Sequence, residues 1–194
     1  MNNLSLTKTE RLAKTEGARG WAMLFGLLGI MCFDQFVAQI PFANLVFPIL
    51  IICAASMNTF KNMVIITVYS VVFELSCVAW LPADLLNVGW WLLEVIIGYA
   101  MPFIVYKTLN RKHKNLSIFT YSALASLAEL MYFWVSIIAT ILIWRVNPIA
   151  YILSDLPYQA VGCVATFVCT IPVAAIYKLT CGELAFKRKS KCNA

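Results

Sequence analysis

The sequence predicts an all-α integral membrane protein with six transmembrane helices and with both termini in the cytoplasm. Composition is the first reason: 62% of the 194 residues are hydrophobic and only 12% are charged, whereas soluble domains average about 25% charged residues. The second reason is that long apolar runs alternate with short basic segments, which is the pattern of a chain that crosses a bilayer several times.

Each expected helix corresponds to a charge-poor run, because a helix needs about 20 apolar residues to cross the hydrocarbon core. The first run is about twice this length and is interrupted at AQIPFANLVFP, where Pro41 removes a backbone donor. The helices are expected at 20–38, 43–59, 62–80, 86–106, 117–144 and 158–177, the second being short and obliquely packed. Residues 1–19 and 179–194 would be basic cytoplasmic segments that flank a transmembrane domain at 20–178.

The basic residues support six helices and set the orientation. Of the 15 Lys and Arg residues, Arg145 is the only one that falls on the outer side of this arrangement. Such an excess on one side places that side in the cytoplasm. The net charge of +6 is then explained by topology and by attraction to anionic lipid, so no nucleic-acid partner is expected.

The sequence carries no catalytic or metal-binding signature. The seven cysteines include no C-x-x-C pair and His113 is the only histidine, so we expect free thiols, no metal site and no cofactor. The sequence contains no G-x-S-x-G, H-E-x-x-H or P-loop motif. The chain is therefore not expected to be an enzyme, and any ATP hydrolysis would belong to partner subunits.

Polar side chains within the apolar runs fall in the outer half of the predicted bundle. Four acids, Asp34, Glu74, Glu94 and Glu129, come from four different helices, and a charge at the bilayer centre costs at least about 2.5–3.5 kcal/mol. Such residues usually face a bundle interior or a wet cavity, which predicts a pocket that opens to the outside and has aromatic walls. The expected substrate-binding residues are Glu74, Trp90, Trp91, Glu94, Glu129, Tyr132, Tyr158 and Gln159.

These residues also have structural explanations. Trp90 and Trp91 fit an interfacial aromatic belt equally well, and Asp34 lies near the end of its run, where a solvated or capping role is expected. Glu94 and Glu129 lie deeper in longer runs, which favours a ligand or a buried network. The carboxyl groups could instead be protonated and hydrogen-bonded to neighbouring helices.

Small residues form one face of the first expected helix. Ala22 and Gly26 are four residues apart in GWAMLFGLLG, and Gly29 lies close by on the same face. This spacing lets another helix approach closely in lipid. The face is either packed within the bundle or docks a second membrane protein.

The segment that leads into the last helix resembles a known family. Its sequence NPIAYILSDLPYQAVGCVATFVCTIPVAAIYKL contains the turn Asp155-Leu156-Pro157-Tyr158 and, later, Pro172. Together with six helices and the Ala22–Gly26 motif, these features are similar to the substrate-binding S components of energy-coupling factor (ECF) ABC transporters. Pro157 would occupy the first turn of the last helix, and Asp155 would cap it.

The resemblance implies a function and partners. An S component binds a vitamin or a related micronutrient in the plasma membrane of a prokaryote, and it works with a coupling transmembrane subunit and two cytosolic ATPase subunits. The Ala22–Gly26 face would contact the coupling subunit. Many members carry His or Asn soon after the turn, where this chain has QAVGCVATF, so the vitamin is left open. Several acids and few bases in the outer half suit a cationic or hydroxyl-rich ring.

Two other functions are compatible with the sequence. A stand-alone secondary transporter would use Glu94 or Glu129 as a proton-coupling acid, although no internal repeat is apparent. A non-transporting membrane scaffold would use the acids only as hydrogen-bonding groups between helices. The scaffold ranks last, because acids at this depth on several helices are costly for packing alone.

Overall fold

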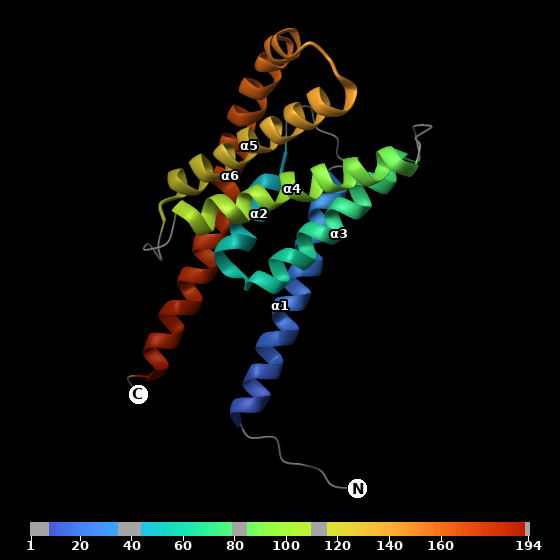
Figure 1. Ribbon diagram of the computed structural model, residues 1–194. Coiled ribbons are helices and arrows are strands. Elements are labelled where there is room, and N and C mark those ends of the chain that lie inside the picture. Colours follow the sequence, from blue (N-terminus) through green and yellow to red (C-terminus); the bar gives the residue numbers. More distant parts are fainter. Residues whose placement is uncertain (1–7, 35–43, 79–84, 110–115, 193–194) are drawn as a thin grey trace, which may run out of the picture.

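The computed structural model describes residues 8–34, 44–78, 85–109 and 116–192, and it describes side chains within 18–34, 44–73, 89–109 and 116–179. This part of the chain is entirely helical and contains no strand, which confirms the all-α prediction (Figure 1). The helices are α1 (Lys8–Phe33), α2 (Val46–Ser56), α3 (Thr59–Val78), α4 (Leu85–Leu109), α5 (Ile118–Trp144) and α6 (Pro148–Cys192).

Among the residues whose side chains the structure describes, three helices are long and apolar enough to cross a membrane. Their apolar segments are Gly89–Leu109 in α4, Ile118–Trp144 in α5 and Pro148–Leu179 in α6. Shorter apolar segments, Ala18–Phe33 and Thr59–Phe73, lie in α1 and α3. These segments indicate that the chain is a membrane-associated protein.

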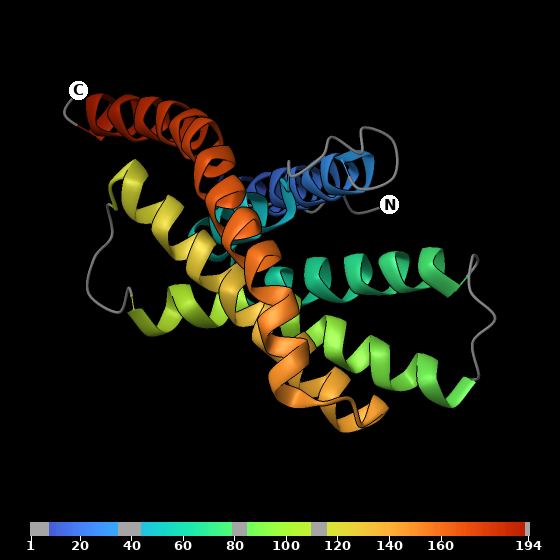
Figure 2. The same ribbon diagram turned by 90° about the horizontal axis from the view of Figure 1, so that it is seen from above.

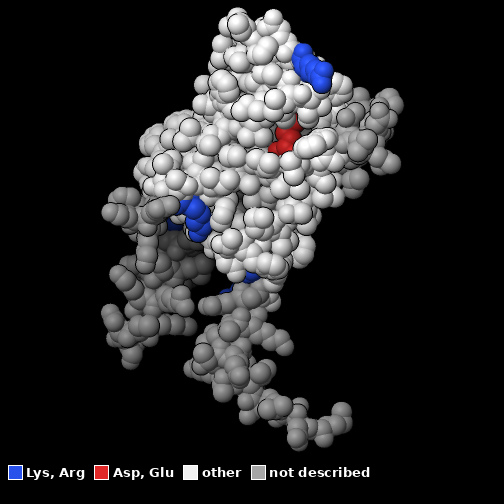
Figure 3. Space-filling model, in the orientation of Figure 1, with Lys and Arg blue, Asp and Glu red and all other residues white. Residues whose placement is uncertain are grey.

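The outer surface of the helices agrees with a lipid environment. Phe25, Phe119, Leu142 and Val164 come from four parts of the chain, and each is more than 60% exposed. Figure 3 shows a face made almost entirely of uncharged side chains, with basic residues towards its margins and an acidic spot within it. An apolar surface this extensive is typical of a protein that contacts lipid or another protein.

Helix α2 lies inside the bundle and is shorter than the expected segment 43–59. Its 11 residues extend about 16 Å, against about 30 Å for the hydrocarbon core. It packs against all five other helices, and residues 46–54 are all buried. The helix ends early because Asn58 caps the start of α3, where its Oδ1 accepts a hydrogen bond from the Lys61 amide at 2.9 Å.

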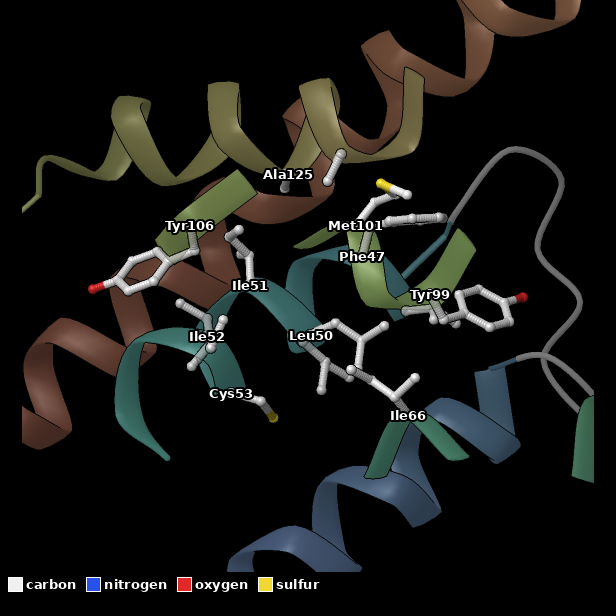
Figure 4. Close-up of a cluster of buried hydrophobic side chains, with 14 of the residues drawn as sticks. Phe47, Leu50, Ile51, Ile52, Cys53, Ile66, Tyr99, Met101, Tyr106 and Ala125 are labelled. Carbon is white, nitrogen blue, oxygen red and sulfur yellow. The ribbon is translucent and has the colours of Figure 1, made fainter. Parts of the chain in front are cut away.

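Apolar side chains from several helices enclose α2 (Figure 4). The close-up shows that the α2 side chains Phe47, Leu50, Ile51, Ile52 and Cys53 lie among Ile66 of α3, Tyr99, Met101 and Tyr106 of α4, and Ala125 of α5. All of these residues are buried. Side chains of α2 therefore make up a large part of the core. In lipid the same contacts act chiefly through close packing.

Helices α4, α5 and α6 share one aromatic contact region. The rings of Tyr106 and Tyr121 stack with centroids 6.4 Å apart, and Tyr177 meets Tyr121 edge-on at 6.0 Å. Lys107 and Lys178 directly follow two of these tyrosines, so both lysines lie at the same end of the bundle. The first turns of α1 and the last turns of α6 also point to one end of the molecule (Figure 1).

The start of α6 differs from the sequence prediction. Helix α5 ends at Arg145, which adopts the left-handed conformation (φ 52°), and α6 begins three residues later at Pro148 instead of at 158. Asn147 caps α6, because its Oδ1 accepts hydrogen bonds from Ile149 N at 3.1 Å and Ala150 N at 3.2 Å. Proline at the first helical position costs no backbone hydrogen bond.

Asp155 and Pro157 therefore do not form the cap and turn that the sequence predicted. Both lie within α6, which continues through Pro157 and Pro172 to Cys192. Asp155 instead accepts a hydrogen bond from Nε2 of Gln159, one turn along, at 3.0 Å. Prolines are tolerated inside membrane helices because neighbouring groups satisfy the freed carbonyls. Figure 2 shows α6 crossing α5 obliquely and curving along its length.

Candidate functional site

The N-terminus of α2 is a polar point in a largely apolar interior. Oδ2 of Asp34, at the end of α1, accepts a hydrogen bond from Leu45 N at 2.9 Å, and Oδ1 of Asn44 accepts one from Val46 N at 3.0 Å. The first N–H groups of a helix have no partner within the helix and carry partial positive charge. Asp34 is only 7% exposed, so its role is to cap α2 and not to face solvent.

Asn44 connects this helix end to Glu129 of α5. Its Nδ2 donates to Oε1 of Glu129 over 3.4 Å, and Glu129 is 3% exposed. Gly162 of α6 leaves room for the carboxyl group, because a β-carbon there would lie 3.3 Å from Oε1 of Glu129 and 3.0 Å from the ring of Phe133. The carboxyl group thus lies where α2, α5 and α6 meet.

Thr166 completes this group of polar side chains. It lies one turn beyond Gly162 on α6, is fully buried, and places its hydroxyl beside the Glu129 carboxyl. Neither Oγ1 of Thr166 nor Oε2 of Glu129 makes a well-formed hydrogen bond with any described residue. A buried polar group without a partner costs about 1–3 kcal/mol. We call Asp34, Asn44, Glu129 and Thr166 the polar cluster.

Aromatic side chains border the polar cluster. Tyr132 follows Glu129 by one turn of α5, and its ring stacks on Tyr99 of α4 with centroids 5.3 Å apart and an angle of 17° between the rings. Tyr69 of α3 meets Tyr99 edge-on at 5.1 Å, and Phe47 of α2 lies 5.5 Å from Tyr132. These aromatic side chains beside the polar cluster could contact the face or the edge of a ligand ring.

A separate groove lies between α4 and α5. It has a volume of about 480 Å³, which is within the usual range for small-molecule sites. Its lining residues are Trp90, Leu93, Glu94, Ile97, Val135, Ile138, Ala139, Leu142 and Ile143. Glu94 is the only ionisable residue in this lining, and its carboxyl group lies close to the Ser136 hydroxyl.

The residues expected to line a single pocket are divided between these two places. Glu129 and Tyr132 belong to the polar cluster and its aromatic border, whereas Trp90 and Glu94 line the groove. Trp91 follows Trp90 directly but does not line the groove, and its ring lies 6.4 Å from that of Trp144.

The remaining expected site residues lie elsewhere. Gln159 is buried, at 3% exposed, and hydrogen-bonds to Asp155. Tyr158 is 67% exposed, so it faces away from the bundle interior. Glu74 belongs to α3, but its side chain lies outside the described residues.

Sequence reasoning missed Asn44 and Thr166. Asn44 follows the Pro41 interruption, and an asparagine two residues before α2 is a recognisable signal for a capping side chain. Thr166 offers a weaker signal, because threonine is common in membrane helices and often bonds to its own backbone. The neighbouring Thr170 does this, donating to the Thr166 carbonyl at 2.6 Å.

The small-residue face of α1 does not pack against any described helix. Ala22, Gly26 and Gly29 are all exposed, and a β-carbon on either glycine would meet nothing within 4 Å. Phe25 and Phe33 on the same helix are 62% and 58% exposed. Packing within the bundle is therefore not the role of these glycines in the described part of the chain.

The described cysteines are free thiols, namely Cys32, Cys53, Cys163 and Cys169. Within the described residues, no three or more His, Cys, Asp or Glu side chains are grouped to hold a metal ion. Comparison with protein-family models, with curated proteins and with solved structures finds no match to this chain.

Proposed function

We propose that the chain is the membrane-embedded substrate-binding subunit of an uptake system, an S component of the ECF class, and that it captures a vitamin or a related micronutrient. The polar cluster is the observation that carries this proposal. It offers a buried carboxyl oxygen of Glu129 and a buried hydroxyl of Thr166 without well-formed protein partners, next to aromatic rings. A ligand that supplies these hydrogen bonds would recover the free energy that their burial costs.

The chemistry of the polar cluster limits the substrate class. The carboxyl group of Glu129 accepts from N–H or O–H donors when ionised, and the Thr166 hydroxyl both donates and accepts. The described part of the cluster contains no Lys or Arg to bind an anion. The favoured substrate is a cationic or hydroxyl-rich ring compound, such as a thiamine-like, pyridine or pyrimidine vitamin, with the tyrosine rings beside it.

The proposed topology has six passes with both termini in the cytoplasm of a prokaryotic cell. Two arrangements support it. Lys61, in the first turn of α3, lies 5.7 Å over the ring of Trp21, which puts the start of α3 level with Trp21 of α1. Arg145 lies at the opposite end of α5 from Lys107 and Lys178. Although α2 is short, it and the turn that follows it would thus return the chain from the outer to the inner side of the membrane.

The partners follow from the same proposal. The chain has no nucleotide-binding motif, so ATP hydrolysis would belong to two cytosolic ATPase subunits. The exposed Ala22, Gly26 and Gly29 face of α1 would dock the coupling transmembrane subunit, because small residues let helix backbones approach closely.

Ligand binding by the purified chain tests the proposal. Native mass spectrometry in detergent, together with thermal unfolding across a panel of vitamins and precursors, should show one adduct and a matching stabilisation. A ligand at about 100 times its Kd adds about 2.7 kcal/mol to the free energy of unfolding. Glu129→Gln, which keeps the size of the side chain, should weaken that binding at least ten-fold.

The alternatives predict different results. A scaffold gives no adduct and no shift with any compound, and that outcome would refute the proposal. A secondary transporter takes up its substrate in proteoliposomes that contain this chain alone, driven by a proton gradient. The proposed S component requires the coupling subunit and the ATPases for sustained uptake.

A further inference from the structure

The groove between α4 and α5 has a single carboxyl group, that of Glu94, in an otherwise apolar lining. At the contact between the two helices, the ring of Tyr132 lies against Gly98. Glu94 precedes Gly98 by one turn, and Ser136 follows Tyr132 by one turn, so the carboxyl and hydroxyl groups lie next to this contact. From there the groove continues to Trp90 on α4 and Leu142 on α5 through aliphatic side chains alone.

Glu94 of α4 lies beside the Ser136 hydroxyl of α5 and lines the groove among apolar side chains. A carboxyl group on a membrane helix is costly, and such residues are functional-site candidates by default. No described Lys or Arg lines the groove, and the serine hydroxyl is the neighbouring polar group. The groove is therefore complementary to a ligand that carries one positive charge and an apolar body.

The groove is also separate from the polar cluster. Glu129 precedes Ser136 by seven residues on α5, about 10 Å along the helix, and it contacts Asn44 and the Gly162 region instead of α4. The Gly98–Tyr132 contact lies between the two acids along the α4–α5 pair.

We propose that this groove binds a single-chain amphipathic amine, with its ammonium group on Glu94 and Ser136 and its alkyl or aryl chain along the apolar walls towards Trp90 and Leu142. The size fits one short chain. The wall from Ser136 to Leu142 is about 9 Å long at 1.5 Å per residue, and the groove volume is about 480 Å³. A two-chain phospholipid fits less well, because its phosphate would lie among apolar residues with no Lys or Arg in the lining.

Octylamine is a suitable probe, because octanol and octanoate have the same chain with a neutral or a negative head. We expect octylamine, and neither of the others, to give a stoichiometric adduct in native mass spectra of the full chain and to raise its Tm. Glu94→Gln should weaken octylamine binding at least ten-fold, since it removes the charge at constant size. Ala139→Leu should also weaken it at least ten-fold by filling the groove.

Two variants serve as controls. Ala123→Leu places the same added bulk on an exposed position of α5 outside the groove, and it should bind octylamine as the wild type does. Glu129→Gln should lose the vitamin of the proposed function but keep octylamine, so that failure at one site is distinguishable from failure at the other.

Several outcomes would overturn the inference. Equal stabilisation by octanol and octylamine, or unchanged octylamine binding in Glu94→Gln, would mean that the groove holds only lipid chains. Absence of any octylamine adduct would also overturn the inference. Displacement of octylamine by phosphatidylethanolamine but not by phosphatidylcholine, in nanodiscs of each lipid, would assign the groove to a lipid headgroup instead.

Discussion

A β-carbon placed on Gly98 of α4 would lie 2.7 Å from Cε2 of Tyr132 on α5, so the tyrosine ring occupies the space that any larger residue would need. The same ring stacks on Tyr99 and meets Phe47 edge-on. It therefore cannot move away without disturbing the aromatic border of the polar cluster. The closeness of α4 and α5 at this point depends on the absence of one methyl group.

The first prediction concerns this contact. Gly98→Ala should lower the free energy of unfolding by about 1–3 kcal/mol, because the added methyl group overpacks a tight contact. Thermal or denaturant unfolding of the purified protein in detergent measures the change. Gly89→Ala, on the same helix but with nothing within 4 Å of the added carbon, is the matched control and should be neutral or slightly stabilising. Equal effects of the two substitutions would contradict the close contact.

The second prediction concerns the cap of α2. Asp34→Ala removes the acceptor of the Leu45 N–H and should destabilise the protein by about 0.5–2 kcal/mol. Asp34→Asn keeps an acceptor oxygen at the same place and should recover much of the loss. The pair is compared by the same unfolding assay. If Asp34→Asn were as unstable as Asp34→Ala, the charge and not the hydrogen bond would be the important property.

The third prediction distinguishes two neighbouring threonines on α6. Thr166→Val should leave stability unchanged or raise it, because it removes a buried hydroxyl that lacks a well-formed partner, but it should weaken binding of the vitamin several-fold. Thr170→Val removes a hydrogen bond to the Thr166 carbonyl and should cost about 0.5–1.5 kcal/mol of stability while leaving ligand affinity nearly unchanged. Unfolding and ligand titration of both variants should therefore show opposite effects: Thr166→Val lowers ligand affinity, and Thr170→Val lowers stability. The reverse pattern would show that Thr166 is a structural residue.

The fourth prediction concerns partner docking. Gly29→Leu should leave the stability of the isolated chain unchanged, since nothing lies within 4 Å of a β-carbon at that position. It should reduce co-purification with the coupling subunit and coupled uptake, because a large residue keeps the partner helix at a distance. Ala160→Leu, at an exposed site on α6, is the control. Normal coupling in Gly29→Leu would remove this face from the proposed interface.

Helices α4 and α5 could be predicted well from the sequence, because each has a long apolar run, whereas α1 begins at Lys8 and not at the expected residue 20. The expected helix at 117–144 is found as Ile118–Trp144, with Ser117 accepting a hydrogen bond from the Thr120 amide. The start of α6 was predicted wrongly because the chain offers the same signal twice. Asn147-Pro148 and Asp155-Leu156-Pro157 both place a capping side chain before a proline, and periodicity in an apolar segment does not decide between them.

The candidate site was predictable only in part. Glu129 was recognisable because an acid in a long apolar run is unusual. Its partner Asn44 lies 85 residues away in the sequence, and no local pattern in a single chain reveals such a contact. Trp90 and Trp91 were expected together, but adjacent residues of a helix point about 100° apart, and only Trp90 lines the groove.

The length of α6 has a mechanical consequence. Its 45 residues extend about 68 Å, more than twice the thickness of a hydrocarbon core. Because α6 is one continuous helix from Pro148 to Cys192, a rotation of the helix where Gly162 passes the Glu129 carboxyl would also displace its C-terminal end.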